Sequence, residues 1–533
     1  MRTRVIAIGM DGADPVLVEQ WMDAGLLPGL AALRREGAWG RLTGLGHHRA
    51  ELAWTTLLTG CEPERTGYWS PLVFTADGYG VHDQGAYDFA EHPPFYALGD
   101  ERRVVVVDVP QTLARNDVDG LQLLAWGSHS PQGPSCSVPP ELFGDLVRRH
   151  GRHPALHRDH ATHWNPVAVA RLRRALRLGI RRRVAICREL LAREPWDLFM
   201  TTFGETHSAS HFLWHLSDET GHPVQRGRAE DALLEVFQAV DAAVHEIVQD
   251  AGDATVVVFS PQGMESNSMD LPSLVFLPEL CYRLSFPGRE ALAPGGSGSP
   301  PPVLRNPRAL AWHRWLWRSR RVDGRLRSVA KRALPLRLAR WSDEDLQPPY
   351  AFGPLFYEPA LWYSALWPRM RAFALPSFSE GYVRINLMGR EASGIVPQGE
   401  YEAVCHELEE HLHQLRDART GRPVVREVVR TRNGPGRDDP RLPDADLIVC
   451  WASDPVDVVD SPTVGRMGPV PFGRTGSHLN RGFVAVRGPA VAAGSRLPDG
   501  KVIDVAPTVL DLVGAAPPMA LDGRSLLAPA PSV

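Results

Sequence analysis

The sequence predicts an α/β fold in which a mostly parallel sheet is sandwiched between helices. Continuous apolar runs recur at residues 5–10, 103–109, 196–203 and 255–260, as expected of strands buried inside a sheet. Polar motifs with candidate functional residues follow these runs. In open α/β sheets, functional sites lie beyond the strand ends in the same way. Helix-like stretches separate the runs, which favours parallel strand connections.

The first apolar run ends at Asp11. It is too short for a signal peptide and reads as the first core strand. An aspartate at the carboxyl end of a first strand is a common ligand position in open α/β sheets. A turn or helix-cap role explains Asp11 equally well, so both interpretations stay open.

A helix is predicted over 52–58, where the apolar spacing buries Trp54 and Gly60 supplies a stop. Its N-terminus would present free amides and the positive end of the helix dipole to an anionic substrate. His48 and Arg49 directly precede it, so we expect them to help bind that substrate.

The stretch 203–214 concentrates reactive side chains, with Glu205, His207 and His211 close together. If it is helical, the two histidines lie four positions apart on one face. That spacing suits two imidazoles on one metal ion. For an isolated pair of this kind, a hydrogen-bonded structural role is the more common explanation.

The bulk properties narrow the class of protein. A length of 533 residues suggests roughly two to four structural units. The formal net charge of −4 provides no field to recruit nucleic acid. No apolar run reaches about 18 residues, so no membrane span is expected. Six scattered cysteines without a CxxC pair, and no secretory signal, indicate free thiols and a cytoplasmic protein. The protein could also form a homo-oligomer.

Residues 1–284 and 351–533 are predicted to form the core, with an accessory βα unit at about 370–432. Residues 285–350 read as an insertion rich in Arg and Trp. Such composition can indicate a membrane surface or a nucleic acid, but we favour a helical cap that packs its tryptophans on the core.

Two further segments complete the expected architecture. Residues 167–193 form a long basic helix whose arginines, Arg183 among them, are expected to face solvent. The apolar runs 446–451 and 483–487 complete the candidate central sheet.

An ordered series of motifs resembles the alkaline phosphatase superfamily, and most of all its type I phosphodiesterase and nucleotide pyrophosphatase branch. The series spans nearly the whole chain and lies at 9–15, 25–28, 53–63, 203–214, 259–264, 384–390, 475–478 and 504–508. The resemblance implies two metals beside a Ser or Thr nucleophile in typical members.

By this resemblance, one metal is held by a D-x-x-x-H motif and a later histidine. His207 stands in the Asp position, His211 in the His position, and His478 fits the later histidine. Three neutral imidazoles with an open fourth position suit zinc, which would lower the pKa of bound water to about 7.

By the same resemblance, some residues of the typical site are missing. The second metal would use Asp11, which is present, and an Asp-His pair that falls on Pro261 and Gln262, so we assign Gln262 to substrate binding. The nucleophile falls on Ala50, which has no hydroxyl. We therefore expect one zinc, with a second metal in doubt.

The expected function is a divergent metal-dependent hydrolase or group-transfer enzyme acting on a phosphorylated or other anionic small molecule. Glu205 or Asp11 would serve as general base or would orient a ligand. One alternative is a non-catalytic binding or scaffold protein, which explains Ala50 and Gln262 but not the three histidines. Another is a conventional two-metal phosphodiesterase, which would require an unexpected nucleophile.

Overall fold

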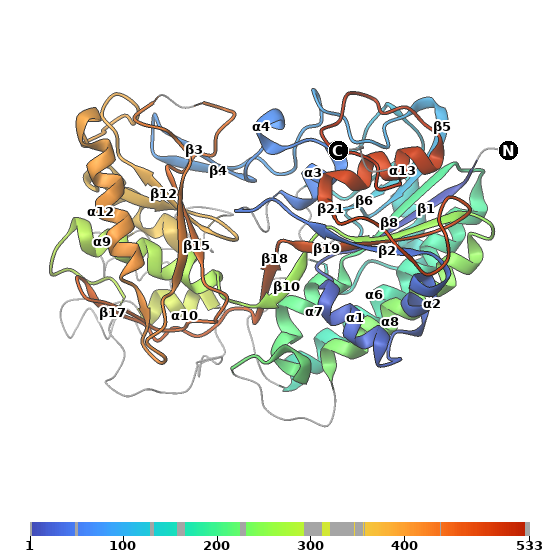
Figure 1. The fold of residues 1–533 in the computed structure, drawn as a ribbon, viewed down its shortest axis with the longest axis horizontal. Helices are drawn as coiled ribbons and strands as arrows, with labels where there is room; N and C mark the ends of the chain where they lie inside the picture. The colour runs from blue at the N-terminus through green and yellow to red at the C-terminus, as the bar shows by residue number, and fades with distance from the viewer. Residues whose placement is uncertain are drawn as a thin grey trace.

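The chain folds into two lobes joined side by side (Figure 1). The structure, a computed structural model, describes residues 3–47, 52–127, 133–156, 166–223, 231–292, 312–319, 346, 355, 358–436 and 439–527. Across these residues, no helix combines the length and the apolar character that crossing a bilayer would demand.

The larger lobe is built on a ten-stranded sheet with the order β20-β2-β19-β9-β1-β8-β5-β6-β7, and β21 also pairs with β2. Most neighbours are parallel, but β19 is antiparallel to β2 and β9, and β7 is antiparallel to β6. This confirms the predicted α/β class. The strands are β1 (Val5–Met10), β2 (Ala38–Thr43), β5 (Gly99–Val107), β6 (Val118–Leu124), β7 (Cys136–Val138), β8 (Leu198–Phe203), β9 (Thr255–Ser260), β19 (Arg481–Arg487), β20 (Ser495–Arg496) and β21 (Gly500–Lys501).

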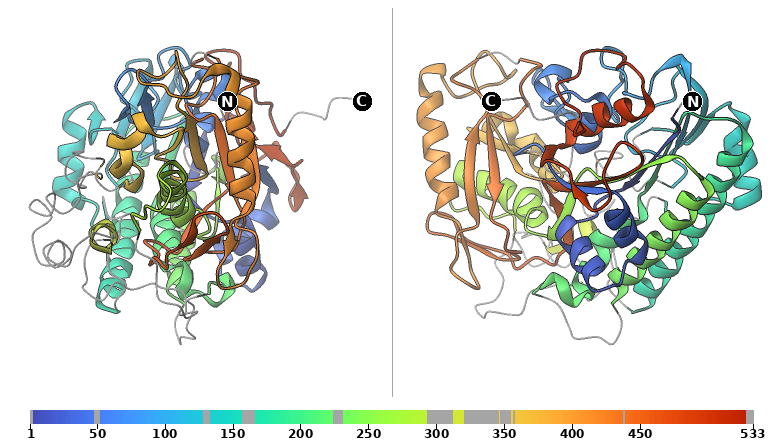
Figure 2. Two further views of the ribbon diagram at one scale, coloured as in Figure 1. Left: turned by 90° about the vertical axis from the view of Figure 1, so that its left-hand side faces the viewer. Right: turned by 45° about the vertical axis from the view of Figure 1, so that its right-hand side comes forward.

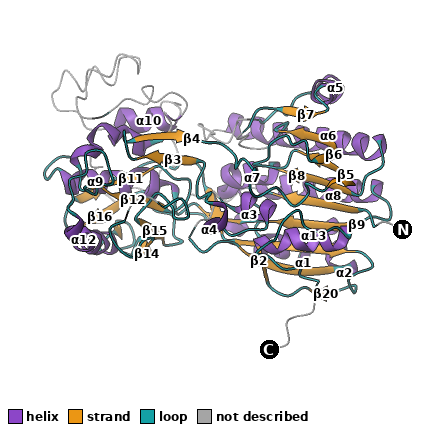
Figure 3. Ribbon diagram, turned by 90° about the horizontal axis from the view of Figure 1, so that it is seen from above, coloured by secondary structure: helices purple, strands orange, loops and turns teal. Residues whose placement is uncertain are grey.

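Helices cover both faces of this sheet, as the views in Figures 2 and 3 make clear. Alternate residues of β1 enter opposite cores: Ile6 and Ile8 face one, and Val5 and Ala7 face the other. The first core is completed by α1 (Pro15–Asp23), α2 (Pro28–Glu36), α5 (Glu141–His150), α6 (Pro166–Arg193), α7 (Glu205–Leu213) and α8 (Ala232–Asp250). The second is completed by α3 (Ala53–Thr59) and α13 (Val505–Val513).

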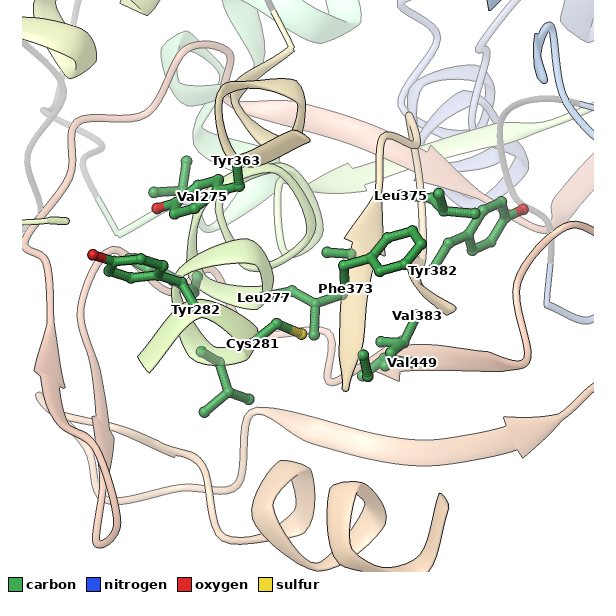
Figure 4. Close-up of a cluster of buried hydrophobic side chains, with 14 of the residues drawn as sticks. Val275, Leu277, Cys281, Tyr282, Tyr363, Phe373, Leu375, Tyr382, Val383 and Val449 are labelled. Atoms are coloured by element: carbon green, nitrogen blue, oxygen red, sulfur yellow. The ribbon is translucent and has the colours of Figure 1, made fainter. Parts of the chain in front are cut away.

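The smaller lobe contains a four-stranded antiparallel sheet with the order β11-β12-β15-β14. Figure 4 shows its core, where Cys281 and Leu277 lie beside Phe373 and Val383. Its elements are the hairpin β3 (Leu72–Thr75) and β4 (Gly80–Asp83), α9 (Leu277–Ser285), α10 (Trp312–Ser319), β11 (Ala372–Leu375), β12 (Gly381–Ile385), α12 (Tyr401–His413), β14 (Val425–Arg430) and β15 (Leu447–Trp451).

The remaining short elements link or flank the two lobes. They are α4 (Pro63–Thr66), β10 (Gly263–Ser266), β13 (Arg416–Asp417), β16 (Val459–Ser461), β17 (Gly465–Met467) and β18 (Gly476–Leu479). Among them, β10 and β18 pair with each other outside both main sheets. This ribbon bears on function because it carries His478.

One predicted strand belongs to a different sheet. The apolar run 446–451 is expected in the central sheet, but β15 pairs with β12 and β14 in the smaller lobe. The physical reason is that a continuous apolar run indicates burial and does not identify the neighbouring strand.

The Arg- and Trp-rich segment lies mostly outside the described residues. One described part of it, α10, packs into the smaller lobe, where the ring of Trp317 meets Trp362 edge-on with 5.3 Å between centroids. The indole nitrogen of Trp312 donates to the carbonyl of Pro471 at 2.6 Å.

A buried carboxylate joins two helices of the larger lobe. Leu27, which precedes α2, offers no side-chain cap. Asp241 of α8 replaces it by accepting from the backbone amides of Gly29 at 2.9 Å and Leu30 at 2.7 Å. The tertiary contact thus satisfies amides that a helix start leaves without intrahelical partners.

We predict that Asp241→Ala lowers the free energy of unfolding by about 2–4 kcal/mol, because two amides lose their acceptor. Urea denaturation followed by circular dichroism measures the effect. Glu246→Ala on the same helix is the control, since Glu246 is 53% exposed. Equal midpoints for the two variants would contradict the capping role.

Candidate metal centre

The predicted site residues meet where three parallel strands end. β8, β1 and β9 are direct neighbours, so their carboxyl ends lie at one edge of the sheet. Asp11 follows β1, and Gln262 follows β9. His207 and His211 lie on α7, which begins directly after β8. His478 arrives from the β10–β18 ribbon.

Three buried histidines form the centre of the site. His207 and His211 have ring centroids 4.4 Å apart, and His478 lies 4.8 Å from the first and 4.9 Å from the second. Their candidate ligand nitrogens all lie within 4.8 Å of one another. The helix spacing explains only the first two, and the third depends on the fold.

The approach of β18 to α7 positions His211. Its Nδ1 lies 2.7 Å from the carbonyl oxygen of Gly476, a residue 265 positions away in the chain. The backbone amide of Thr475 also donates to the carbonyl of His211 at 2.8 Å. A Cβ atom on Gly476 would lie 2.1 Å from the carbonyl oxygen of Ser210, so only glycine permits this contact.

Asp11 is fully buried and holds the ring of His207. Its Oδ2 lies 3.3 Å from Nδ1 of His207. Its Oδ1 accepts from the indole nitrogen of Trp54 at 3.0 Å and from the amide nitrogen of Gln262 at 3.3 Å. A carboxylate on one ring nitrogen directs the other toward a metal, so Asp11 is suited to orient His207.

Gln262 therefore lies in the site, but as a hydrogen-bond donor to Asp11. An amide N–H has no lone pair to offer a cation. The same oxygen of Asp11 also accepts from Trp54, so Gln262 helps to hold this carboxylate in place.

Arg474 and Asp270 complete the wall beside His211. Nη1 of Arg474 lies 3.1 Å from Nε2 of His211. The same guanidinium donates to both carboxylate oxygens of Asp270, at 2.7 and 2.9 Å. Burial, Arg474 and the two other histidines lower the pKa of His211 well below its usual range. His211 is therefore a neutral imidazole at pH 7.

Glu205, the first residue of α7, belongs to a buried ionic network. Its carboxylate lies 3.1 Å from Nε2 of His153 and 3.2 Å from Nε of Arg183. Burial raises the pKa of Glu205, but Arg183 and His153 outweigh it, so the net pKa is lowered. This engagement suits Glu205 to anchoring α7 better than to accepting a proton.

Arg183 corrects the expectation that the arginines of the long helix face solvent. Its side chain is fully buried and also pairs with Asp108 at 2.8 Å. Burial lowers the pKa of Arg183, and the two carboxylates more than offset that effect. Arg183 of this basic helix therefore faces inward, where it pairs with two carboxylates from other segments.

The remaining candidates either fall outside the described residues or have other hydrogen-bond partners. His48 and Arg49 fall outside the described residues, as does Ala50. The hydroxyl of Thr55 donates to Gln111 at 3.1 Å, and that of Thr56 donates to the carbonyl of Leu52 at 2.7 Å. Both threonines are thus engaged in structural hydrogen bonds.

The histidine cluster fits a borderline cation such as zinc. At a tetrahedral zinc, imidazole nitrogens about 2.1 Å from the metal lie about 3.4 Å apart, so a small contraction of the cluster suffices. With Nδ1 of His211 bonded to Gly476, Nε2 is its ligand atom. Because Arg474 contacts that same atom, its guanidinium must withdraw when a cation binds.

Sequence reasoning missed Arg474, Asp270, Gly476 and Arg183. Arg474 and Gly476 stand only four and two positions before His478, so their proximity to that motif was available as a signal. Asp270 and Arg183 carry no such signal, because their partners come from distant segments.

We predict that Gly476→Ala disrupts the centre, because its methyl group would push β18 away from α7 and break the bond to His211. The expected result is at least a tenfold loss of zinc affinity, comparable to the loss of an orienting partner. Isothermal titration with zinc measures it. Gly399→Ala would contradict the argument if it weakened zinc binding as much, since nothing lies within 4 Å of a Cβ there and its φ is not positive.

A family model for type I phosphodiesterase/nucleotide pyrophosphatase matches residues 5–283, just over half of the chain. No curated protein sequence matches significantly.

Three solved structures are among the similar ones. Phosphonoacetate hydrolase from Sinorhizobium meliloti, in complex with phosphonoformate, is 12% identical, with 96% of each chain covered and a TM-score of 0.47. Murine ectonucleotide pyrophosphatase/phosphodiesterase 5 is 10% identical, with 98% of this chain and 97% of that chain covered and a TM-score of 0.49. The human protein of the same name is 12% identical, with the same coverage and a TM-score of 0.48.

The family match extends from β1 into α9 and includes Asp11, His207, His211 and Gln262. The chain therefore belongs to the type I phosphodiesterase/nucleotide pyrophosphatase family, within the alkaline phosphatase superfamily.

Proposed function

We propose that this protein is a divergent metal-dependent hydrolase or group-transfer enzyme that uses one zinc ion held by His207, His211 and His478. The observation that carries the proposal is the convergence of these three buried imidazoles from α7 and β18. Its substrate would be a phosphorylated or other anionic small molecule, in keeping with the family. Zinc in such a site polarises oxygen groups and makes water reactive near neutral pH.

The side chains around the histidines have defined tasks in this proposal. Asp11 orients the ring of His207, and the Gly476 carbonyl orients that of His211. Arg474, once it leaves His211, offers N–H donors to an anionic group in place of that contact. Glu205 anchors the start of α7 through Arg183.

No covalent step through a serine or threonine is part of the proposal. Alanine occupies position 50, where the family resemblance sets the nucleophile. Thr55 and Thr56 use their hydroxyls in structural hydrogen bonds. Direct attack by water is the route that needs no side-chain nucleophile.

We predict that His478→Ala abolishes stoichiometric zinc binding at this site and any turnover that depends on it. Removing one of three protein ligands should cost more than the about 10–100-fold typical of an orienting partner. Equilibrium dialysis with elemental analysis, and hydrolysis of p-nitrophenyl phosphate mono- and diesters, measure the two effects.

The controls separate a ligand from a surface histidine and from a nucleophile. His406→Ala alters a side chain that is 69% exposed and should change neither quantity. Thr55→Ala and Thr56→Ala should retain both. Turnover that survives in His478→Ala but is lost in a threonine variant would refute the one-metal mechanism.

A second candidate function is favoured by Arg474. Its guanidinium already supplies a positive charge against His211, and Asp270 holds it there through two hydrogen bonds. A metal-free protein that binds an anionic ligand and catalyses nothing would use this arrangement as it stands. Fold alone does not decide between the two.

We predict that Arg474→Gln strengthens zinc binding by about tenfold or more if the site is a metal centre. The substitution removes a charge-assisted hydrogen bond, worth about 1.5–3 kcal/mol, that competes for the ligand atom of His211. Competition titration against a chromophoric chelator measures the change.

The exposed pair of Arg466 and Asp460 provides a matched control, so Arg466→Gln should leave zinc affinity unaltered. Under the metal-free alternative, neither the wild type nor Arg474→Gln binds stoichiometric zinc at the histidines. The variant would instead lose affinity for inorganic phosphate.

A further inference from the structure

A second cluster of ligand-type side chains lies apart from the three histidines. It consists of His47, Glu427 and Cys450, whose candidate ligand atoms all lie within 4.8 Å of one another. The thiol sulfur of Cys450 lies 3.4 Å from Nδ1 of His47. None of the three residues belongs to the site described above.

The smaller lobe contributes two of these side chains from paired strands. Glu427 of β14 and Cys450 of β15 are register partners, so their side chains project from the same face of the sheet. A register irregularity between Val425 and Glu427 directly precedes the pair. Irregularities of this kind re-aim side chains at sheet edges, and β14 is an edge strand.

The larger lobe contributes the third side chain. His47 lies four positions beyond the end of β2, and Asn480, in the turn between β18 and β19, holds the intervening segment. The side-chain amide of Asn480 donates to the carbonyl of Leu45, and the backbone carbonyl of Asn480 accepts from the amide of Gly44 at 3.4 Å. The cluster thus bridges the two lobes.

We propose that His47, Glu427 and Cys450 bind a thiophilic divalent cation of the zinc class, with the fourth position open to water. At a tetrahedral zinc, sulfur at about 2.3 Å and nitrogen at about 2.0 Å lie about 3.5 Å apart, close to the distance between Cys450 and His47. The mixed sulfur, nitrogen and oxygen set excludes Mg²⁺ and Ca²⁺, which take oxygen ligands.

The Cys450 sulfur carries a proton when no cation is bound. Burial and the carboxylate of Glu380 raise the pKa of Cys450 to about 11, against the opposing effect of Arg426. Without a cation the sulfur is therefore a thiol that can donate to His47. A bound cation displaces that proton, as metal binding to cysteine generally does.

The consequence is a link between the two lobes. His47 lies on the segment that follows β2 in the larger lobe, and Glu427 and Cys450 lie in the sheet of the smaller lobe. A cation bound by all three side chains would hold the two lobes together. The proposal is independent of zinc at the three histidines.

Cobalt(II) titration of the metal-free full-length protein tests the proposal. A thiolate bound to cobalt gives a near-ultraviolet charge-transfer band that imidazole and carboxylate ligands do not give. We expect the wild type to show this band with the amplitude of one cobalt–thiolate site per chain, and Cys450→Ser to lack it. Cys136→Ser, which alters a half-buried thiol, should retain the band.

His478→Ala should also retain the band, which separates this cluster from the histidine centre. Glu427→Gln and His47→Ala keep the thiol, and each should weaken the cobalt affinity measured from this band by at least tenfold. These two variants test the proposal even if Cys450→Ser fails to fold. Absence of the band in the wild type, or its persistence in folded Cys450→Ser, would overturn the proposal and leave only a thiol–imidazole hydrogen bond.

Discussion

The close packing of β18 against α7 is the constraint on which the candidate centre depends. Gly476 lets two backbones approach so closely that its carbonyl reaches the ring of His211. The same approach brings His478 onto the face that already carries His207 and His211. Because no pair of neighbouring residues in the sequence can create it, the three-histidine cluster is a property of the whole fold.

The buried charges around this contact are arranged in separate groups with different roles. Asp11 faces His207 and receives hydrogen bonds from Trp54 and Gln262. Glu205 faces the other way and pairs with Arg183. Each buried carboxylate thereby gains donors that compensate its loss of hydration. One helix start can thus combine a reactive face with an anchoring face.

Two features distinguish this member of the family. One is Arg474, and the other is the replacement of the residues that the resemblance assigns to the nucleophile and the second metal. A guanidinium beside His211 can substitute electrostatically for a cation, or yield to one. One oxygen of Asp11 accepts hydrogen bonds from Trp54 and Gln262. The proposed one-metal centre and the metal-free anion site differ at Arg474, which has to leave His211 in the first and stays beside it in the second.

The fold class and the family could be predicted from the sequence alone. Apolar runs marked the buried strands, and Asp11, His207, His211 and Gln262 followed those runs closely enough to predict one shared edge of the sheet. The sequence did not determine that β15 joins the smaller sheet or that Arg183 is buried. The sequence also did not predict the hydrogen bonds of Arg474, Gln262 and Gly476. Only the tertiary structure decided these points, because periodicity reports burial, whereas a side chain's partner depends on which distant segments the fold brings within contact distance.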